Sequence, residues 1–218
     1  MPASRDQTRQ NYDRLSRWYD LFAGSEKKFT EAGLQILNVK AGEYVLEIGF
    51  GTGHSLAAIA RQVGNSGLAA GMELSPGMIK VARKRMYPFG HKQAEGQEGS
   101  ARMIQGDGTR LPFVPHSFDA VFLSFTLELF ADAEITVVLQ ECQRVLKQDG
   151  RFGVVSLAKR DVLACRLYEW GHERWPALLD CRPIHVRETL EAGGFRVQAS
   201  KVQALWGLPV EIVLGRPF

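Results

Sequence analysis

The sequence predicts a single α/β domain spanning residues 1–218, with a mostly parallel sheet covered by helices on both faces. Short apolar runs alternate with helical patterns, which is typical of βαβ units. A glycine-rich turn follows the first run, and acidic residues end or follow the next two, so polar groups are expected along one edge of the sheet. The chain is long enough for one substantial core and too short for two full domains with linkers.

Composition and charge narrow the class of protein. Apolar residues make up 45% and charged residues 23%, as in ordinary globular proteins. The net charge of +3 is small, which argues against nucleic-acid binding. The N-terminus lacks the apolar core of a signal peptide and no run approaches the length of a membrane span, so we expect a cytoplasmic protein.

The cysteines predict neither a metal site nor a disulfide framework. Cys142, Cys165 and Cys181 are odd in number and far apart, and the chain has no Cys-x-x-Cys pair. A trio of thiolates for a soft element such as arsenic is one interpretation. Buried, inert thiols in a reducing compartment are the expectation that we adopt.

The N-terminal segment predicts a helix over residues 6–22 that forms a lid within residues 1–24. Its apolar face carries Tyr12, Leu15, Tyr19 and Phe22. The plain alternative is a solvated helix packed on the core, and a transient contact with a membrane surface is a third, opposed by the acids that dilute the basic charge. Gly24-Ser25 is expected to break this helix, and a second helix over 26–37 leads to the first strand.

The stretch Val45–Gly53 predicts a strand, a tight turn and the start of a helix. Glu47 lies two residues before the first glycine. Glycines adopt positive φ at little cost and let a ligand approach the backbone, and the helix beyond directs free N–H groups toward it. The turn residues expected to contact a ligand are Gly49, Phe50, Gly51 and Gly53. A dinucleotide fingerprint has a small residue where this chain has His54, which argues against an NAD-dependent oxidoreductase.

The second apolar run, Leu68–Glu73, ends in an acid at a strand tip. In nucleotide-binding sheets such an acid accepts hydrogen bonds from ribose hydroxyls, although Glu73 could also favour a helix N-terminus by its charge. Leu74 is adjacent, and Ser75-Pro76 opens the next helix. Met78 follows one turn inside, where it either covers an adenine face or fills the core.

Two further strand tips complete the predicted crevice. The run 101–105 ends before Asp107 and Gly108, and this aspartate suits an adenine amino group or simply a turn. The run 117–125 is expected to lie beside the first strand. Its tip residues that face the crevice are Ser124 and Phe125.

The last third of the chain supplies the rest of the sheet and an acceptor site. The expected elements are a helix over 132–147, a turn at Asp149-Gly150, a strand over 151–157, a helix over 185–192 and an antiparallel hairpin of 195–205 and 208–214. Between them, residues 158–192 are interpreted as an insertion in which Tyr168, His172 and Trp175 bind the acceptor. The alternative is that these rings only cover the sheet.

Several of these motifs occur together in a fixed order. They are Glu47-x-Gly49-x-Gly51-x-Gly53, Glu73, Gly106-Asp107, Leu111-Pro112-Phe113, Ser117-Phe118-Asp119 and Val145-Leu146-Lys147-x-Asp149-Gly150. The combination resembles the class I methyltransferases that use S-adenosylmethionine, in particular the branch with the ubiquinone/menaquinone biosynthesis C-methyltransferases. The resemblance runs from Tyr12 to about Val155.

This resemblance implies a Rossmann-like sheet of seven strands in the order 3-2-1-4-5-7-6, with one antiparallel strand. It implies S-adenosyl-L-methionine as cofactor, with the methionine part on the loop Gly49–Gly53, the ribose on Glu73 and the adenine on Asp107. The quinone enzymes carry an Asn-Val pair after the fourth strand, where this chain reads Thr126-Leu127-Glu128-Leu129. The acceptor therefore stays open among a quinol carbon, an amine or lipid headgroup, and a thiol.

A catalytic base is needed only if the acceptor arrives protonated. The candidates are Glu128, His54, His172 and His185. For each of them we adopt a structural role, and no residue is assigned as catalytic. The alternatives to a methyltransferase are an NAD-dependent oxidoreductase and a cofactor-binding module whose partner performs the chemistry.

Overall fold

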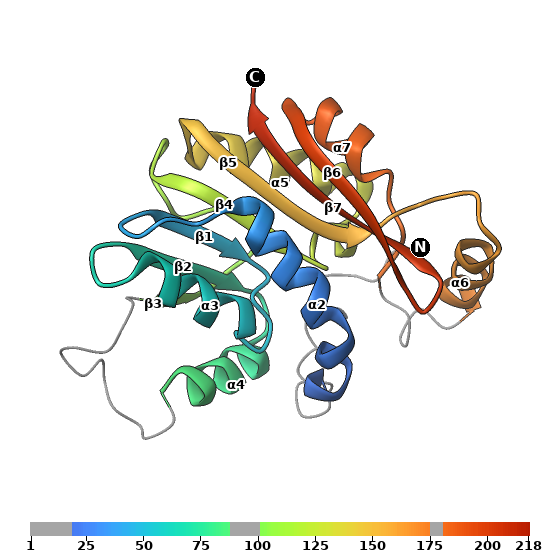
Figure 1. The fold of residues 1–218 in the computed structure, drawn as a ribbon, viewed down its shortest axis with the longest axis horizontal. Helices are drawn as coiled ribbons and strands as arrows, with labels where there is room; N and C mark the ends of the chain where they lie inside the picture. The colour runs from blue at the N-terminus through green and yellow to red at the C-terminus, as the bar shows by residue number, and fades with distance from the viewer. Residues whose placement is uncertain (1–18, 88–100, 175–180) are drawn as a thin grey trace.

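The protein folds around one seven-stranded sheet (Figure 1). The computed structural model describes residues 19–87, 101–174 and 181–218, without the side chains of 19–23, 169–170 and 172–173. The strands are β1 (Tyr44–Ile48), β2 (Leu68–Glu73), β3 (Ala101–Gln105), β4 (Phe118–Ser124), β5 (Leu146–Leu157), β6 (Phe195–Leu205) and β7 (Leu208–Pro217). Their order is β3-β2-β1-β4-β5-β7-β6, and β7 runs antiparallel to both neighbours. The expected fold class is confirmed.

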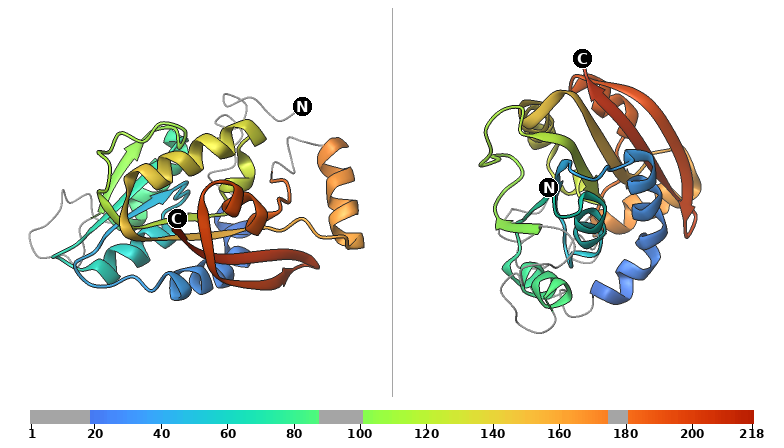
Figure 2. Two further views of the ribbon diagram at one scale, coloured as in Figure 1. Left: turned by 90° about the horizontal axis from the view of Figure 1, so that it is seen from above. Right: turned by 60° about the vertical axis from the view of Figure 1, so that its left-hand side comes forward.

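Helices cover both faces of the sheet. They are α2 (Tyr19–Leu37), α3 (His54–Val63), α4 (Pro76–Met86), α5 (Asp132–Val145), α6 (Leu163–Arg174) and α7 (Val186–Ala192), with a 3-10 turn η1 at Leu127–Leu129. One core cluster joins α2, α3 and α4 to the sheet, and another joins α5 and α7 to its opposite face. Figure 2 shows α6 standing at one end of the molecule, apart from these layers.

The central strands are buried on both faces, which explains their nearly continuous apolar runs. Successive residues of a strand point to opposite faces, so Leu46 and Val121 belong to the core under α5, whereas Val45 and Phe122 belong to the core under α2. The strands β1 to β4 also pair in parallel. The carboxyl ends of β1 to β4 therefore come together at one edge of the sheet.

The N-terminal helix differs from the prediction. One continuous helix, α2, passes through Gly24, where we expected a break. Glycine inside a helix costs only about 1 kcal/mol, and α2 buries Phe29, Leu34 and Leu37 against the sheet. The burial outweighs the glycine penalty. The rest of the expected lid, with Tyr12, lies outside the described residues, as does the side chain of Tyr19.

The start of β5 also differs. We expected a turn at Asp149-Gly150 and a strand from residue 151, whereas β5 begins at Leu146 directly after α5. The register against β4 shifts between Phe118, which pairs with Leu146, and Ala120, which pairs with Arg151. The predicted turn is thus a bulge within one strand pair, because residues 147–150 face a single residue of β4.

Candidate functional site

A cavity of about 510 Å³ opens where β1 to β4 end. Its walls come from those strand tips, from α2 and α3, and from residues 124–131 with Glu134. In open α/β sheets this crevice beyond the carboxyl ends is where ligands bind. Ten of the residues expected to bind the cofactor line it: Glu47, Gly49, Phe50, Gly51, Glu73, Leu74, Asp107, Gly108, Ser124 and Phe125.

The glycine loop has the backbone geometry that only glycine adopts easily. Gly49, Gly51 and Gly53 have φ values of 74°, 51° and 81°. A Cβ on Gly49 would overlap the side chain of Thr126, so the segment that follows β4 approaches the loop closely. Gly53 does not line the cavity; a Cβ there would lie 2.8 Å from that of Ala82 on α4. Gly53 therefore serves close packing of the loop on α4.

Glu47 is a buried acid at the base of the cavity. Its side chain is 1% exposed, and Oε1 accepts a hydrogen bond from Ser55 Oγ, while Oε2 has no hydrogen-bond partner among the described residues. Burial raises the pKa of this carboxyl to about 8; the Ser55 bond opposes the shift and the negative charge of Glu73 adds to it. A cation in the cavity would relieve this cost by stabilising the carboxylate.

Glu73 joins two of the loops that line the cavity. One carboxylate oxygen accepts a hydrogen bond from the N–H of Gly51 at 2.9 Å, and the other accepts one from the N–H of Ser75, also at 2.9 Å. A carboxylate offers about four acceptor sites, so two backbone bonds leave capacity for ligand hydroxyls. One oxygen of Asp107 stabilises its own turn. Oδ1 accepts hydrogen bonds from both the N–H and the hydroxyl of Thr109 at 2.9 Å.

The fourth strand tip contacts α2 across the cavity. The hydroxyls of Ser124 and Thr30 lie 2.8 Å apart. Phe125 has a φ of 51°, which is rare for a bulky residue, and its ring packs edge-on against Phe29 at 6.2 Å between centroids. Strained backbone that survives at a site is held there by its surroundings, here by the bond from the Phe125 N–H to the carbonyl oxygen of Val155 at 2.7 Å.

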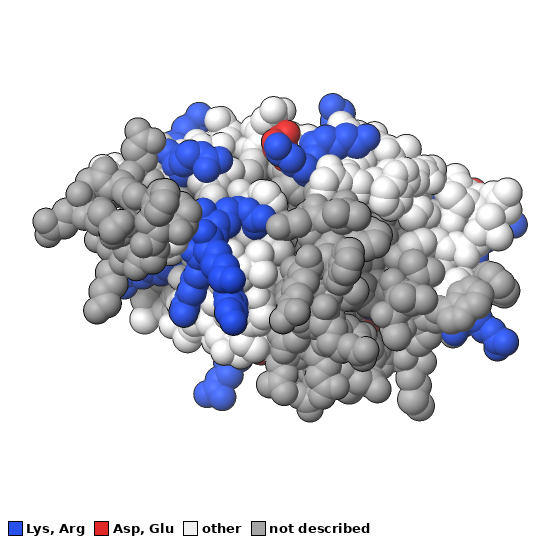
Figure 3. Space-filling model, turned by 90° about the horizontal axis from the view of Figure 1, so that it is seen from below, with Lys and Arg blue, Asp and Glu red and all other residues white. Residues whose placement is uncertain are grey.

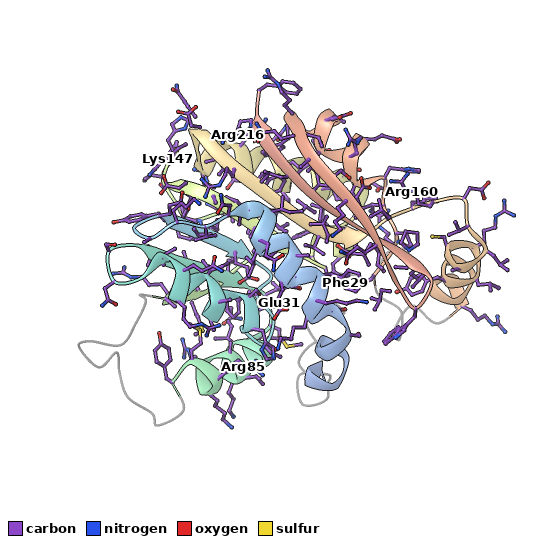
Figure 4. All side chains as sticks on the ribbon, in the orientation of Figure 1. Phe29, Glu31, Arg85, Lys147, Arg160 and Arg216 are labelled. Atoms are coloured by element: carbon purple, nitrogen blue, oxygen red, sulfur yellow. The ribbon has the colours of Figure 1, made fainter. Side chains whose placement is uncertain are left out.

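The sequence analysis missed the wall opposite the glycine loop. This wall is formed by Thr30, Glu31, Leu34, Leu129, Phe130 and Glu134. Thr30 and Leu34 are one helical turn apart, a spacing that could have indicated a face of α2 directed at a ligand. Figure 4 labels Glu31, a residue of this wall on α2, and also Arg85 on α4.

Helix α4 supports the glycine loop from behind. Arg85 donates a hydrogen bond to the carbonyl oxygen of Thr52. The outer side of this helix is basic, with Lys80, Arg83 and Lys84 exposed, and Figure 3 shows Lys and Arg gathered on the face seen from below. Met78 is fully buried, does not line the cavity, and donates its N–H to Ser75 Oγ at 3.1 Å. It fills the core, which was one of its two expected roles.

Of the expected acceptor residues, the structure describes the side chain of Tyr168 alone. Tyr168 packs against the core cluster under α2 and does not line the cavity. The side chain of His172 and all of Trp175 lie outside the described residues. Sequence reasoning could not place Tyr168, because its surroundings depend on how α6 docks on the sheet.

Of the candidate bases, only His54 lines the cavity among those whose side chains are described. Glu128 is 1% exposed and accepts the N–H of Leu157 at 3.1 Å in the core. His185 precedes α7, with Nδ1 3.8 Å from Glu188. Glu128 and His185 thus lie outside the lining of the cavity.

Within the described ranges, no group of three His, Cys, Asp or Glu side chains could hold a metal ion. Cys142 is buried, and this burial raises the pKa of its thiol. In the same part of the chain, every helix is too short or too polar to cross a bilayer.

The sequence is similar to known proteins over about half to two thirds of its length. Residues 45–150 match the family model described as a methyltransferase domain. The chain is 32% identical over 149 residues to a demethylmenaquinone methyltransferase of Lactobacillus johnsonii, and the match covers 68% of this chain and 57% of that protein. The chain therefore spans less than two thirds of the length of this relative.

Solved structures share the fold at lower identity. The cyclase SpnF superposes with a TM-score of 0.76 at 19% identity, covering 100% of this chain and 98% of SpnF. An S-adenosylmethionine-dependent methyltransferase of Aquifex aeolicus gives a TM-score of 0.61 at 19% identity, covering 86% and 89% of the two chains. The solved structures and the strand order agree in the fold. The sequence matches show that the chain belongs to the methyltransferases with this domain, over residues 45–150, and such enzymes use S-adenosylmethionine as cofactor.

Proposed function

We propose that the protein transfers a methyl group from S-adenosylmethionine to a lipophilic acceptor. The observation that carries the proposal is Glu47, a buried carboxyl with a raised pKa and an oxygen without a hydrogen-bond partner among the described residues, at the base of a cavity behind a glycine loop. Such a group calls for a cationic partner. The α-ammonium group of S-adenosylmethionine has the charge and the donors that it requires.

The remaining contacts follow from the strand tips. Glu73 would accept the ribose hydroxyls, Asp107 and Gly108 would face the adenine, and the loop Gly49–Gly51 would hold the methionine part. When bound, S-adenosylmethionine supplies a methyl group activated by its sulfonium. The chain's own contribution is to align the acceptor and exclude water, and good alignment is worth about 7–11 kcal/mol of a barrier.

The wall formed by α2 and residues 124–134 favours a flat, apolar acceptor. Leu34, Phe125, Leu129 and Phe130 supply its apolar surface. The Thr30–Ser124 hydroxyl pair lies beside it and offers a polar group for orientation. A quinol fits this combination, and the relative from Lactobacillus johnsonii is named a demethylmenaquinone methyltransferase. We therefore propose a quinol carbon as acceptor, with amines and thiols as alternatives for the assay.

The assay for this function uses tritium-labelled S-adenosylmethionine with a demethylmenaquinol, an amine and a thiol in parallel. Label is expected in the quinol. A protein that binds S-adenosylmethionine without transferring label to any acceptor would act as a cofactor-binding module. Stabilisation by NAD rather than by S-adenosylhomocysteine in a thermal melt would instead favour an oxidoreductase.

Glu73→Ala is expected to weaken S-adenosylhomocysteine binding by roughly tenfold to a hundredfold. The variant loses acceptors for two ribose hydroxyls, and a hydrogen bond to a charged group contributes about 1.5–3 kcal/mol. Calorimetric titration measures the affinity. Glu43→Ala is the control, since Glu43 pairs with Arg151 and does not line the cavity. Wild-type affinity in Glu73→Ala would remove Glu73 from the cofactor site.

A further inference from the structure

Exposed apolar side chains gather at one end of the molecule. Nine large hydrophobic residues are exposed within the described ranges, and five of them belong to α6, the residue before it and the β6–β7 hairpin. These five are Val162, Leu163, Leu167, Val202 and Trp206, with exposures of 40, 72, 59, 47 and 76%. Single exposed hydrophobic residues are ordinary, whereas a group of them marks an interaction surface.

The helix and the hairpin lie side by side. A Cβ on Gly207, in the hairpin turn, would lie 3.8 Å from the Cβ of Ala164 on α6. Leu163 and Leu167 are one turn apart on that helix and share a side. Figures 1 and 2 both show the hairpin tip and α6 at the same end. We call Leu163, Leu167 and Trp206 the end patch.

The backbone holds Trp206 at the tip of the hairpin. The turn has two residues, Trp206 and Gly207, with φ values of 50° and 86°. This geometry fits a type I′ turn, which favours asparagine or aspartate in the first position. Tryptophan there costs conformational energy and exposes a large ring. A turn alone does not require a tryptophan at positive φ with its ring in solvent. A binding surface would explain why this residue is present.

Basic residues flank the end patch. Lys159 and Arg160 follow β5, and Arg166 lies on α6; Arg160 is 51% exposed (Figure 4). Arg160 is 3.5 Å from Glu211, and Arg166 is 2.7 Å from Asp161, so acids balance part of this charge. Tryptophan, leucine and basic side chains together suit the interface of a bilayer, where rings sit among the headgroups and cations meet lipid phosphates.

We propose that the end patch docks the protein on the surface of an anionic phospholipid bilayer. Val210 pairs with Leu157 at the end of β5, so the hairpin tip extends beyond the carboxyl ends of the parallel strands. The cavity opens at that end of the sheet. Docking would therefore turn the cavity end toward the lipid. The link to the acceptor rests on the proposed function, because a lipophilic acceptor could then enter without crossing water.

Vesicle flotation with the full chain tests the docking. The vesicles contain phosphatidylcholine alone or with phosphatidylglycerol. Wild type is expected to float with the anionic vesicles and less with the neutral ones. Trp206→Asn and Leu167→Gln are each expected to lower the partition coefficient about tenfold, as for loss of a large apolar side chain from a buried position. Trp206→Asn creates an Asn-Gly turn, which this hairpin geometry prefers, so misfolding does not explain a loss.

Val114→Gln is the matched control. Val114 is 73% exposed, close to the 76% of Trp206, and lies before β4 at the opposite end of that strand. It should float like wild type. Equal flotation of all variants, or a wild type that ignores anionic vesicles, overturns the proposal. Self-association that the same substitutions abolish in sedimentation velocity would overturn it in favour of an interface between copies. S-adenosylhomocysteine titration of each variant reports separately on the proposed function.

Discussion

Gly49→Ala should abolish useful cofactor binding, with an affinity for S-adenosylhomocysteine lowered about a hundredfold or more. Gly49 has a φ of 74°, and a Cβ there would overlap Thr126. The backbone conformation costs an alanine about 1 kcal/mol, and forced overlap in a packed site costs about 1–3 kcal/mol more. The loop must move to relieve both, which shifts the N–H of Gly51 away from Glu73. Calorimetric titration gives the affinity and urea unfolding gives the stability.

Two variants separate the causes. Gly51→Ala meets no protein atom within 4 Å of its added Cβ, so urea unfolding of this variant reports the cost of positive φ without overlap. Combining Gly49→Ala with Thr126→Ala removes most of the overlap and should restore part of the affinity. If Gly49→Ala binds and unfolds like wild type, close contact between the glycine loop and Thr126 is not needed for the site.

Binding of S-adenosylhomocysteine should release close to one proton near pH 6.5. In the free protein burial raises the pKa of Glu47 to about 8, so the carboxyl is mainly protonated there. An ammonium group beside it would favour the carboxylate and expel the proton. Affinity should rise with pH by up to about tenfold per unit below pH 8 and then level off. Titrations in phosphate and imidazole, which both buffer near this pH and whose ionisation enthalpies differ, measure the proton count.

Glu47→Gln should bind more weakly and show no buffer dependence of its enthalpy, whereas Glu73→Gln should keep the buffer dependence. The pH dependence of the stability of the free protein gives a second test of the raised pKa of Glu47. Between pH 4.5 and about 8 the folded state holds a proton on Glu47 that the unfolded state has lost. Glu47 therefore lowers the free energy of unfolding as pH rises through this range. Equal enthalpies in both buffers would show that binding does not change the protonation of Glu47.

Half of the cavity was predictable from the sequence because its chemistry is local. The apolar runs before Glu73 and before the turn around Asp107 change abruptly to an acid. This change predicts a polar strand tip at each place. The parallel arrangement then brings these tips together. The other wall depends on how a helix docks: Thr30 and Ser124 are 94 residues apart in the chain. No local pattern reports that contact.

The wrong prediction at Gly24 has the same origin. Gly24 was interpreted as a helix break from its intrinsic preference, and the tertiary burial of Phe29 and Leu37 prevailed. Tyr168 was assigned to an acceptor site because aromatic residues cluster near it in the chain. Its ring packs against the core cluster under α2 and does not line the cavity, a placement set by the docking of α6, and its role in acceptor binding stays a prediction.

The position of β7 has a consequence for synthesis of the chain. It is the last of the seven strands to leave the ribosome, yet it lies between β5 and β6. Until residues 208–217 emerge, β5 has one open edge, and β6 has none of the partners that the completed sheet gives it. Open strand edges recruit other chains, and nonlocal pairing is slow. In a nascent chain, β1 to β5 can therefore pair before the C-terminal part of the sheet is able to form.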